Sequence, residues 1–173
     1  MRETRRTLKE QFERILGEHG AAISRLAYSY EAIAGIREEL LQEIALAIWQ
    51  ALPHFRGDCS ERTFIFRIAH NRGLTHVARR RPPQQSLDDL EEADEPVDPR
   101  PHPDDHLAQM NQQERLGSAV QSLPLAHKQM IVLMLEGLSH AEIGEVLGIT
   151  ENNVAVRLSR ARKALKQVMG VTQ

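Results

Sequence analysis

Apolar residues in the first part of the chain recur at the three- and four-residue spacing of a helix. Between residues 12 and 27 they occupy one helical face, and a clearer stripe follows at Leu41, Ile44, Ile48 and Leu52. Pro53 comes directly after this stripe, and proline lacks the amide N–H that a helix interior needs. The pattern therefore predicts helices up to residue 53.

A further helix is predicted from Glu61 to about Arg80. Ser60 precedes it, and a serine hydroxyl at that position accepts a hydrogen bond from a first-turn amide. Residues 53–60 form the loop between the helices. The face that we expect to be buried consists of Phe64, Ile65, Ile68 and Ala69.

The chain from residue 107 onward predicts another set of helices. The first covers Leu107–Val120. The next begins near Pro124, which suits a first helical turn, and ends before Gly137, a residue type common just after helix C-termini.

A short helix, a tight turn and a longer helix are predicted after Gly137. Ser139 and Glu142 have the spacing of a capping box, which opens the short helix. Gly148 ends that helix, and Thr150 caps the last one. Two helices joined by about three residues with a glycine in the turn are typical of a helix-turn-helix.

The last helix has one apolar face and one polar face. At about 100° per residue, the apolar stripe is Val154, Leu158, Ala161 and Leu165. The polar face is rich in Asn, Arg and Ser, which hydrogen-bond DNA base edges, and its exposed valine suits a thymine methyl. An ordinary basic surface helix is the alternative. The polar face consists of Asn152, Asn153, Val156, Ser159, Arg160 and Lys163, with Arg157 and Arg162 on its flanks.

Composition narrows the class of protein. Aromatic residues make up 4% of the 173 residues, which favours helices, because strands favour aromatic and β-branched side chains. No apolar run approaches the roughly 18 residues of a membrane span, and no apolar signal segment follows the basic N-terminus. Cys59 is the single cysteine, so no internal disulfide is possible. We expect a cytoplasmic protein without membrane insertion.

The sequence contains no recognisable catalytic or cofactor motif. It lacks a glycine-rich phosphate loop, paired cysteines and an HExxH motif, and its eight histidines are scattered. We therefore expect no metal, no cofactor and no enzymatic activity.

Acidic residues concentrate in one proline-rich segment. Nine acids face one base between Leu87 and Asp105, so this segment carries −8 and the rest of the chain carries +6. Such a composition is typical of an extended linker. We predict an all-α protein with two small helical domains, residues 1–81 and 107–173, joined by a flexible acidic linker at residues 82–106. The second domain contains the helix-turn-helix.

Both halves together resemble a bacterial RNA polymerase sigma factor of the extracytoplasmic-function (ECF) type. The stretch REELLQEIALAIWQALPHFRGD and the helix after it, residues 37–81, resemble region 2 of that family. The stretch LSHAEIGEVLGITENNVAVRLSRARKAL, with the residues before it from 123, resembles region 4. The resemblance implies a transcription initiation factor that binds core RNA polymerase and directs it to specific promoters.

The resemblance also implies partners and roles for the first domain. Glu39, Gln42 and Glu43 share one helical face, which in this family docks on the β′ clamp helices of the polymerase. The β flap, promoter DNA and an anti-sigma factor or other regulator are the further partners that it implies. The residues expected at the minus-ten element, where a base is flipped out and held, are Arg56, Asp58, Ser60, Arg67, Asn71, Arg72, Arg79 and Arg80.

The resemblance further implies that the last helix reads the minus-thirty-five element. The residues that it places against DNA are Asn152, Asn153, Val156, Arg157, Ser159 and Arg160. The last helix departs from the family pattern at one point. Ala155 and Val156 stand where the family usually has a basic residue and a serine, so the promoter sequence read here is expected to differ. Two alternatives stay open at this stage. One is a stand-alone helix-turn-helix regulator, and the other is a decoy that binds polymerase or an anti-sigma factor without reading promoters.

Overall fold

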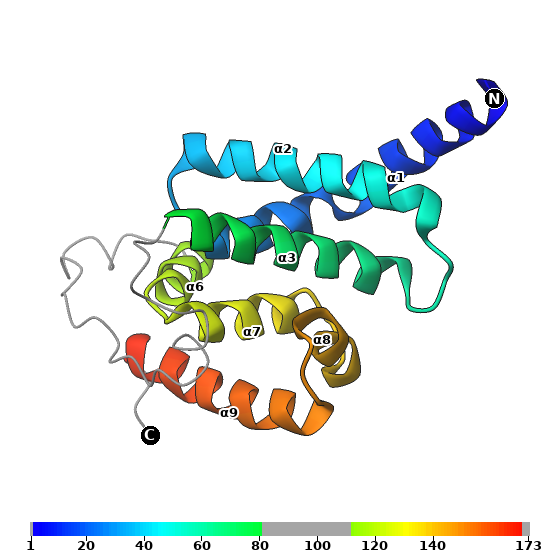
Figure 1. Ribbon diagram of the computed structural model, residues 1–173. Coiled ribbons are helices and arrows are strands. Elements are labelled where there is room, and N and C mark those ends of the chain that lie inside the picture. The colour runs from blue at the N-terminus through cyan, green and yellow to red at the C-terminus, as the bar shows by residue number, and fades with distance from the viewer. Residues whose placement is uncertain (1, 81–111, 171–173) are drawn as a thin grey trace.

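The computed structural model describes residues 2–80 and 112–170, and within these ranges every regular element is a helix (Figure 1). The first part contains α1 (Arg2–Tyr30), α2 (Ala34–Ala51) and α3 (Glu61–Arg80), with a 3-10 turn, η1 (Leu52–His54), after α2. The expected all-α class is confirmed. The predicted linker at residues 82–106 lies outside the described residues.

Within residues 112–170 the structure describes four helices. They are α6 (Gln112–Gln121), α7 (Leu125–Leu135), α8 (His140–Leu147) and α9 (Glu151–Val168). Pro124 stands just before α7, and Gly137 follows its end with a positive φ of 77°, as expected for residues at these positions. None of the described helices has the length and apolarity needed to cross a membrane.

The two sets of helices pack against each other as two layers. Figure 1 shows α1, α2 and α3 in the upper layer and α7, α8 and α9 below them. Helix α7 packs against α1, and α8 packs against α3. The buried apolar residues of both layers form one continuous cluster, which runs from Ile15 in α1 to Ala164 in α9.

The buried face of α3 differs from the expected one. Ile65 and Ala69 are fully buried, but Phe64 and Ile68 are only partly buried, and Phe66 is buried instead. The reason is that α3 is covered by α1, α2 and α8 together, so its buried face is wider than a single stripe.

Tyr30, at the end of α1, lies across α3 at Gly73. A Cβ atom at position 73 would stand 2.5 Å from two carbons of the Tyr30 ring, closer than packed carbons approach. The Tyr30 hydroxyl lies 2.6 Å from Nδ1 of His70, one turn earlier on α3. Glycine at position 73 therefore allows an aromatic side chain to fill the space between α1 and α3.

We predict that Gly73→Ala destabilises the fold. The added methyl overlaps a ring that is held by its hydrogen bond to His70, and overpacking of this kind costs about 1–3 kcal/mol in the free energy of unfolding. Urea denaturation measures the change. Gly17→Ala on α1 is the matched control, because a Cβ there meets no atom within 4 Å. It should stabilise the helix by about 0.5–1 kcal/mol. Equal effects of the two substitutions would contradict the packing described.

We also predict that stability falls with acidification because of His70. Burial lowers the pKa of His70 to about 4, below its ordinary value of 6.5, so the folded state resists protonation that the unfolded chain accepts. The contribution of neutral His70 to the free energy of unfolding is fully present above pH 6.5 and is lost as the pH falls toward 4. The expected loss between pH 7.5 and pH 5 is about 2 kcal/mol in the free energy of unfolding, measured in urea. His70→Gln should show a flatter pH dependence, and an unchanged slope would contradict this assignment.

Candidate nucleic-acid interface

Helices α8 and α9 form a helix-turn-helix whose ends are fixed by side-chain caps. The Ser139 hydroxyl accepts a hydrogen bond from the Glu142 amide at 3.2 Å, and the Glu142 carboxylate accepts one from the Ser139 amide at 2.8 Å. The predicted capping box is therefore confirmed. Gly148 ends α8 with φ at 69°, and the Thr150 hydroxyl accepts a hydrogen bond from the Asn153 amide at 3.4 Å. These contacts set the direction in which α9 leaves the turn.

Gly144 is a second requirement of this turn, and sequence reasoning missed it. A Cβ at position 144 would lie 2.7 Å from the backbone oxygen of Ile149. The Gly144 carbonyl also accepts a hydrogen bond from the Ile149 amide at 3.0 Å. The turn therefore folds back directly onto the backbone of α8. A glycine within an eight-residue helix was the one available signal.

The outward face of α9 is close to the predicted one. Asn152, Asn153, Val156, Ser159 and Arg160 are exposed, and Arg157 is half-buried at the edge of this face. The buried stripe differs from the expectation at one position. Ala164 is buried beside Val154, Leu158 and Ala161, whereas Leu165 is only partly buried. Helix α6 also packs against α9, and this second neighbour shifts the covered face.

The residues predicted for the minus-ten element lie in the loop before α3 and along α3 itself. Arg72 is half-buried, and the other seven, which are Arg56, Asp58, Ser60, Arg67, Asn71, Arg79 and Arg80, are exposed. Ser60 also has a structural role, because its hydroxyl accepts a hydrogen bond from the Thr63 amide at 3.0 Å and thereby caps α3 as predicted.

Phe55 in the loop and Phe64 on α3 lie against each other. Their ring centroids are 4.6 Å apart, and both side chains are half-buried. Together they make an apolar surface in the segment that also carries Asp58 and Ser60. An apolar surface next to hydrogen-bonding groups has the chemical character of a pocket for an unstacked base.

The last turn of α3 is tied to α2 and to the connection between α1 and α2 by ion pairs that the sequence did not reveal. Arg79 Nη1 lies 3.3 Å from a carboxylate oxygen of Glu43 on α2. Arg80 Nε lies 3.5 Å from Glu31, which also contacts Nε2 of His76 at 3.2 Å. The Ile33 amide donates a further hydrogen bond to Glu31 at 2.9 Å. Arg79 and Arg80 are thus exposed but already paired with carboxylates.

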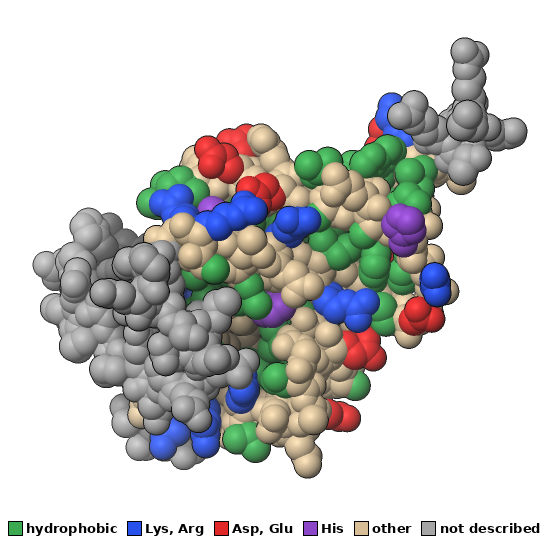
Figure 2. Space-filling view, viewed as in Figure 1, with side chains coloured by type: hydrophobic (Ala, Val, Ile, Leu, Met, Phe, Trp, Pro, Cys, Tyr) green, Lys and Arg blue, Asp and Glu red, His purple; other side chains and the backbone are tan. Residues whose placement is uncertain are grey.

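The face of α2 that was predicted to bind polymerase is exposed over most of its length. Glu39 and Gln42 are exposed, whereas Glu43 is half-buried beside Arg79. Leu46 lies one turn further along the same face and is 56% exposed. Figure 2 shows Asp and Glu side chains gathered over α2, next to Lys and Arg side chains over α3. An acidic face and a basic face therefore adjoin each other in the upper layer.

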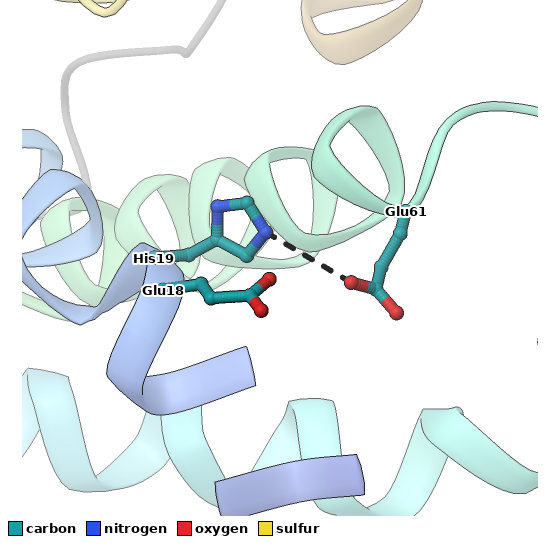
Figure 3. A group of neighbouring side chains, drawn as sticks. All are labelled: Glu18, His19 and Glu61. Carbon is teal, nitrogen blue, oxygen red and sulfur yellow. Dashed lines mark ion pairs between the residues drawn. The ribbon is translucent and has the colours of Figure 1, made fainter. Parts of the chain in front are cut away.

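One group of side chains in the described ranges has metal-ligand character. Figure 3 shows Glu18 and His19 on α1 approaching Glu61 at the start of α3. Arg14 already pairs with both carboxylates: its Nη1 lies 2.8 Å from Glu18 and its Nη2 lies 2.6 Å from Glu61. The hydrogen bond from Arg14 lowers the pKa of Glu61. The Arg14 guanidinium thus neutralises the carboxylates that a metal ion would need as ligands. These side chains therefore act as an ion-pair link between α1 and α3.

Comparisons with known proteins agree with this geometry. Residues 15–82 match the family model of sigma-70 region 2, and residues 113–165 match that of sigma-70 region 4. RNA polymerase sigma factor CnrH of Cupriavidus metallidurans is 29% identical over 164 residues, which cover 91% of this chain and 86% of CnrH. The ECF RNA polymerase sigma-E factor of Escherichia coli K12 is 28% identical over 134 residues, covering 73% of this chain and 70% of that protein.

Two solved structures share the fold. CnrH in complex with the cytosolic domain of CnrY matches with a TM-score of 0.66 at 22% identity, covering 95% of this chain and 91% of that one. The sigma factor RpoE in complex with the anti-sigma factor NepR from Bartonella quintana matches with a TM-score of 0.70 at 19% identity, covering 95% and 99%. With both family regions present in order and relatives along most of its length, the chain belongs to the sigma-70 family of RNA polymerase sigma factors, in its ECF group.

Proposed function

We propose that this sigma factor reads two promoter elements with its two halves while bound to core RNA polymerase. Residues 1–81 would bind the polymerase and the minus-ten element, and residues 107–173 would read the minus-thirty-five element. The observation that carries the proposal is the exposed face of α9. This face presents Asn, Ser and Arg side chains, and α9 belongs to a capped helix-turn-helix. The protein itself would catalyse nothing, because the polymerase supplies the chemistry.

The polymerase contact would use the acidic face of α2. Glu39 and Gln42 are free to meet a basic surface such as the β′ clamp helices, and complementary charge speeds and orients such encounters. Glu43 would join them after separating from Arg79. The Arg79–Glu43 ion pair is exposed, so its separation costs little free energy. The β flap would be the partner of the second half.

The minus-ten contact would combine base capture with phosphate binding. Asp58, Ser60 and Asn71 offer hydrogen-bonding groups for a flipped base, and the Phe55–Phe64 pair offers the apolar wall. The arginines at positions 56, 67, 72, 79 and 80 would bind backbone phosphates, which gives affinity but no sequence preference.

The minus-thirty-five contact would place the N-terminal half of α9 in a major groove. Asn152, Asn153 and Arg160 would hydrogen-bond base edges, and Val156 would contact a thymine methyl. Arg157, half-buried at the edge of the face, and Ser159 would complete the contact with the backbone and neighbouring bases.

A protein regulator would control this activity in the cytoplasm. Both structural relatives were solved in complex with a partner, CnrY for CnrH and the anti-sigma factor NepR for RpoE. We propose that the present chain is likewise held by an anti-sigma factor or a protein that acts as one.

Run-off transcription tests the proposed function and its residues. We expect the purified protein, mixed with bacterial core polymerase and genomic fragments, to start transcripts that share two spaced upstream elements. Arg160→Ala should weaken dependence on the upstream element, and Asn71→Ala dependence on the downstream one, each by roughly 1–3 kcal/mol in binding. Glu145→Ala, on the exposed side of α8 and outside both sets, is the control.

The alternative functions predict different outcomes. Core binding without any transcript would favour the decoy. Tight, specific DNA binding without polymerase would favour a stand-alone regulator. Failure to bind core polymerase at all would refute the proposed function.

A further inference from the structure

The connection between α1 and α2 carries a nearly buried carboxylate, Glu31, which faces the last turn of α3. Figure 1 shows the end of α3 beside this connection, and the Glu31 side chain is 10% exposed. Its Oε1 atom accepts a hydrogen bond from the Ile33 amide at 2.9 Å. The Arg37 guanidinium donates hydrogen bonds to the backbone oxygens of Glu31 and Ala32. Contacts within the connection therefore fix the position of the carboxylate.

The second carboxylate oxygen of Glu31 is shared by two side chains of α3. Oε2 lies 3.2 Å from Nε2 of His76 and 3.5 Å from Nε of Arg80. His76 and Arg80 are four residues apart, so they lie on the same face of the helix. The His76 side chain is only 11% exposed, whereas that of Arg80 is 46% exposed. The same oxygen thus joins an inner histidine to an outer arginine.

Glu31 stays ionised in this position. Burial by itself raises the pKa of the Glu31 carboxyl. The hydrogen bonds from the Ile33 amide and from His76, together with the charge of Arg80, outweigh burial and lower the pKa below its ordinary value. The carboxylate therefore remains negative between about pH 5 and pH 8, where histidine side chains change their charge.

The net charge of these three side chains depends on the protonation of His76. A neutral imidazole can donate to Glu31 through Nε2, and the charges of Glu31 and Arg80 then cancel. A protonated imidazole adds one positive charge, so two cations share one carboxylate oxygen. Because Arg80 is the more exposed of the two cations, it is the one that an external anion such as a phosphate can reach.

The charged side chains that reach this end of α3 from α2 are engaged in other contacts. Arg79 pairs with Glu43 at 3.3 Å. The Arg37 guanidinium donates to the backbone of the connection and lies 4.7 Å from the centroid of the Tyr28 ring. Neither contact involves the Glu31 carboxylate.

The titratable groups that meet α3 from α1 and α8 lie further from its end. His70, which contacts Tyr30 of α1, has its pKa lowered to about 4 by burial and is therefore neutral between about pH 6 and pH 8. Glu142 of α8 is influenced by Ser60 and Arg62, at the opposite end of α3. Between about pH 6 and pH 8, the charge at the last turn of α3 therefore depends on His76.

We propose that His76 is a positioning residue that controls the phosphate contact of Arg80 through Glu31. This inference rests on the proposed function, because it takes Arg80 as a phosphate-binding residue at the minus-ten element. Neutral His76 leaves Glu31 to neutralise Arg80, whereas protonated His76 competes for the same oxygen and releases Arg80 to a phosphate. Mild acidification therefore tightens the contact with minus-ten DNA.

Holoenzyme assembled from bacterial core polymerase and the full chain tests this inference. The probe is a labelled DNA fragment with the minus-ten element of a promoter mapped by run-off transcription. Its affinity is measured at about pH 6 and about pH 8, each over a series of salt concentrations. His76→Gln keeps a hydrogen-bond donor toward Glu31 but does not titrate. Glu31→Gln removes the charge that neutralises Arg80.

His19→Gln is the matched control. His19 also lies beside a carboxylate, at 3.9 Å from Glu61, but Arg14 pairs with that carboxylate and neither residue belongs to the proposed minus-ten set. Circular dichroism at both pH values checks that every variant keeps its helices. Should Glu31→Gln fail to fold, His76→Gln alone decides the question.

The expected result is a pH dependence that requires His76. Relative to His76→Gln, the unaltered holoenzyme should gain about threefold in affinity between about pH 8 and about pH 6, and its salt dependence should steepen by up to about 0.9 in the log–log slope, the value of one added phosphate contact. Glu31→Gln should bind more tightly than the unaltered chain at about pH 8, whereas loss of a merely structural carboxylate would weaken binding. His19→Gln should follow the unaltered chain.

Two failures are distinguishable. If the holoenzyme binds the fragment but His76→Gln shows the same pH and salt dependence as the unaltered chain, the role of His76 is overturned and the proposed function stands. If the holoenzyme does not bind the fragment at either pH, the proposed function fails and this inference fails with it.

Discussion

The packing of α7 and α8 against α1 and α3 is the interaction on which the arrangement of the free chain depends. Helix α8 has eight residues, too few to be stable in isolation. It is held by its capping box and by burial of Ile143 and Val146 among its neighbours. Because α8 also packs on α7 and α9, the helix-turn-helix keeps its internal contacts if α8 leaves α3. Separation of the two halves would therefore leave the helix-turn-helix intact.

Separation of the two halves costs free energy, which a binding partner would have to offset. Separation of the halves exposes apolar residues that now lie in one cluster, and exposed apolar patches of appreciable size mark protein interaction sites. Polymerase or a regulator that covers those surfaces would stabilise the open form by its differential affinity for it. A regulator that binds the closed form would instead hold the two halves together.

Local sequence signals predicted the helix ends and the exposed faces well. Ser60, Ser139 with Glu142, and Thr150 all cap the helices that they precede, because a cap depends on residues at most three positions apart. Contacts between residues far apart in the sequence could not be predicted. Tyr30 on Gly73, Arg79 on Glu43, and Arg25 on Glu136 join positions whose proximity follows from the tertiary fold. Spacing within one helix carries no signal for such pairs.

The ion pairs of α3 show how a site predicted residue by residue changes once the residues are brought together. Arg79 and Glu43 were assigned to DNA and to polymerase separately, yet they pair at 3.3 Å with side chains 61% and 41% exposed. An exposed ion pair of this kind contributes at most about 1 kcal/mol to stability, so either side chain can leave it to bind another group. A polymerase surface that takes Glu43 leaves Arg79 available to a phosphate, and a phosphate that takes Arg79 leaves Glu43 available to polymerase. Under the proposed contacts, binding of the two partners would therefore be cooperative through this pair, and the weakness of the pair would keep that cooperativity small.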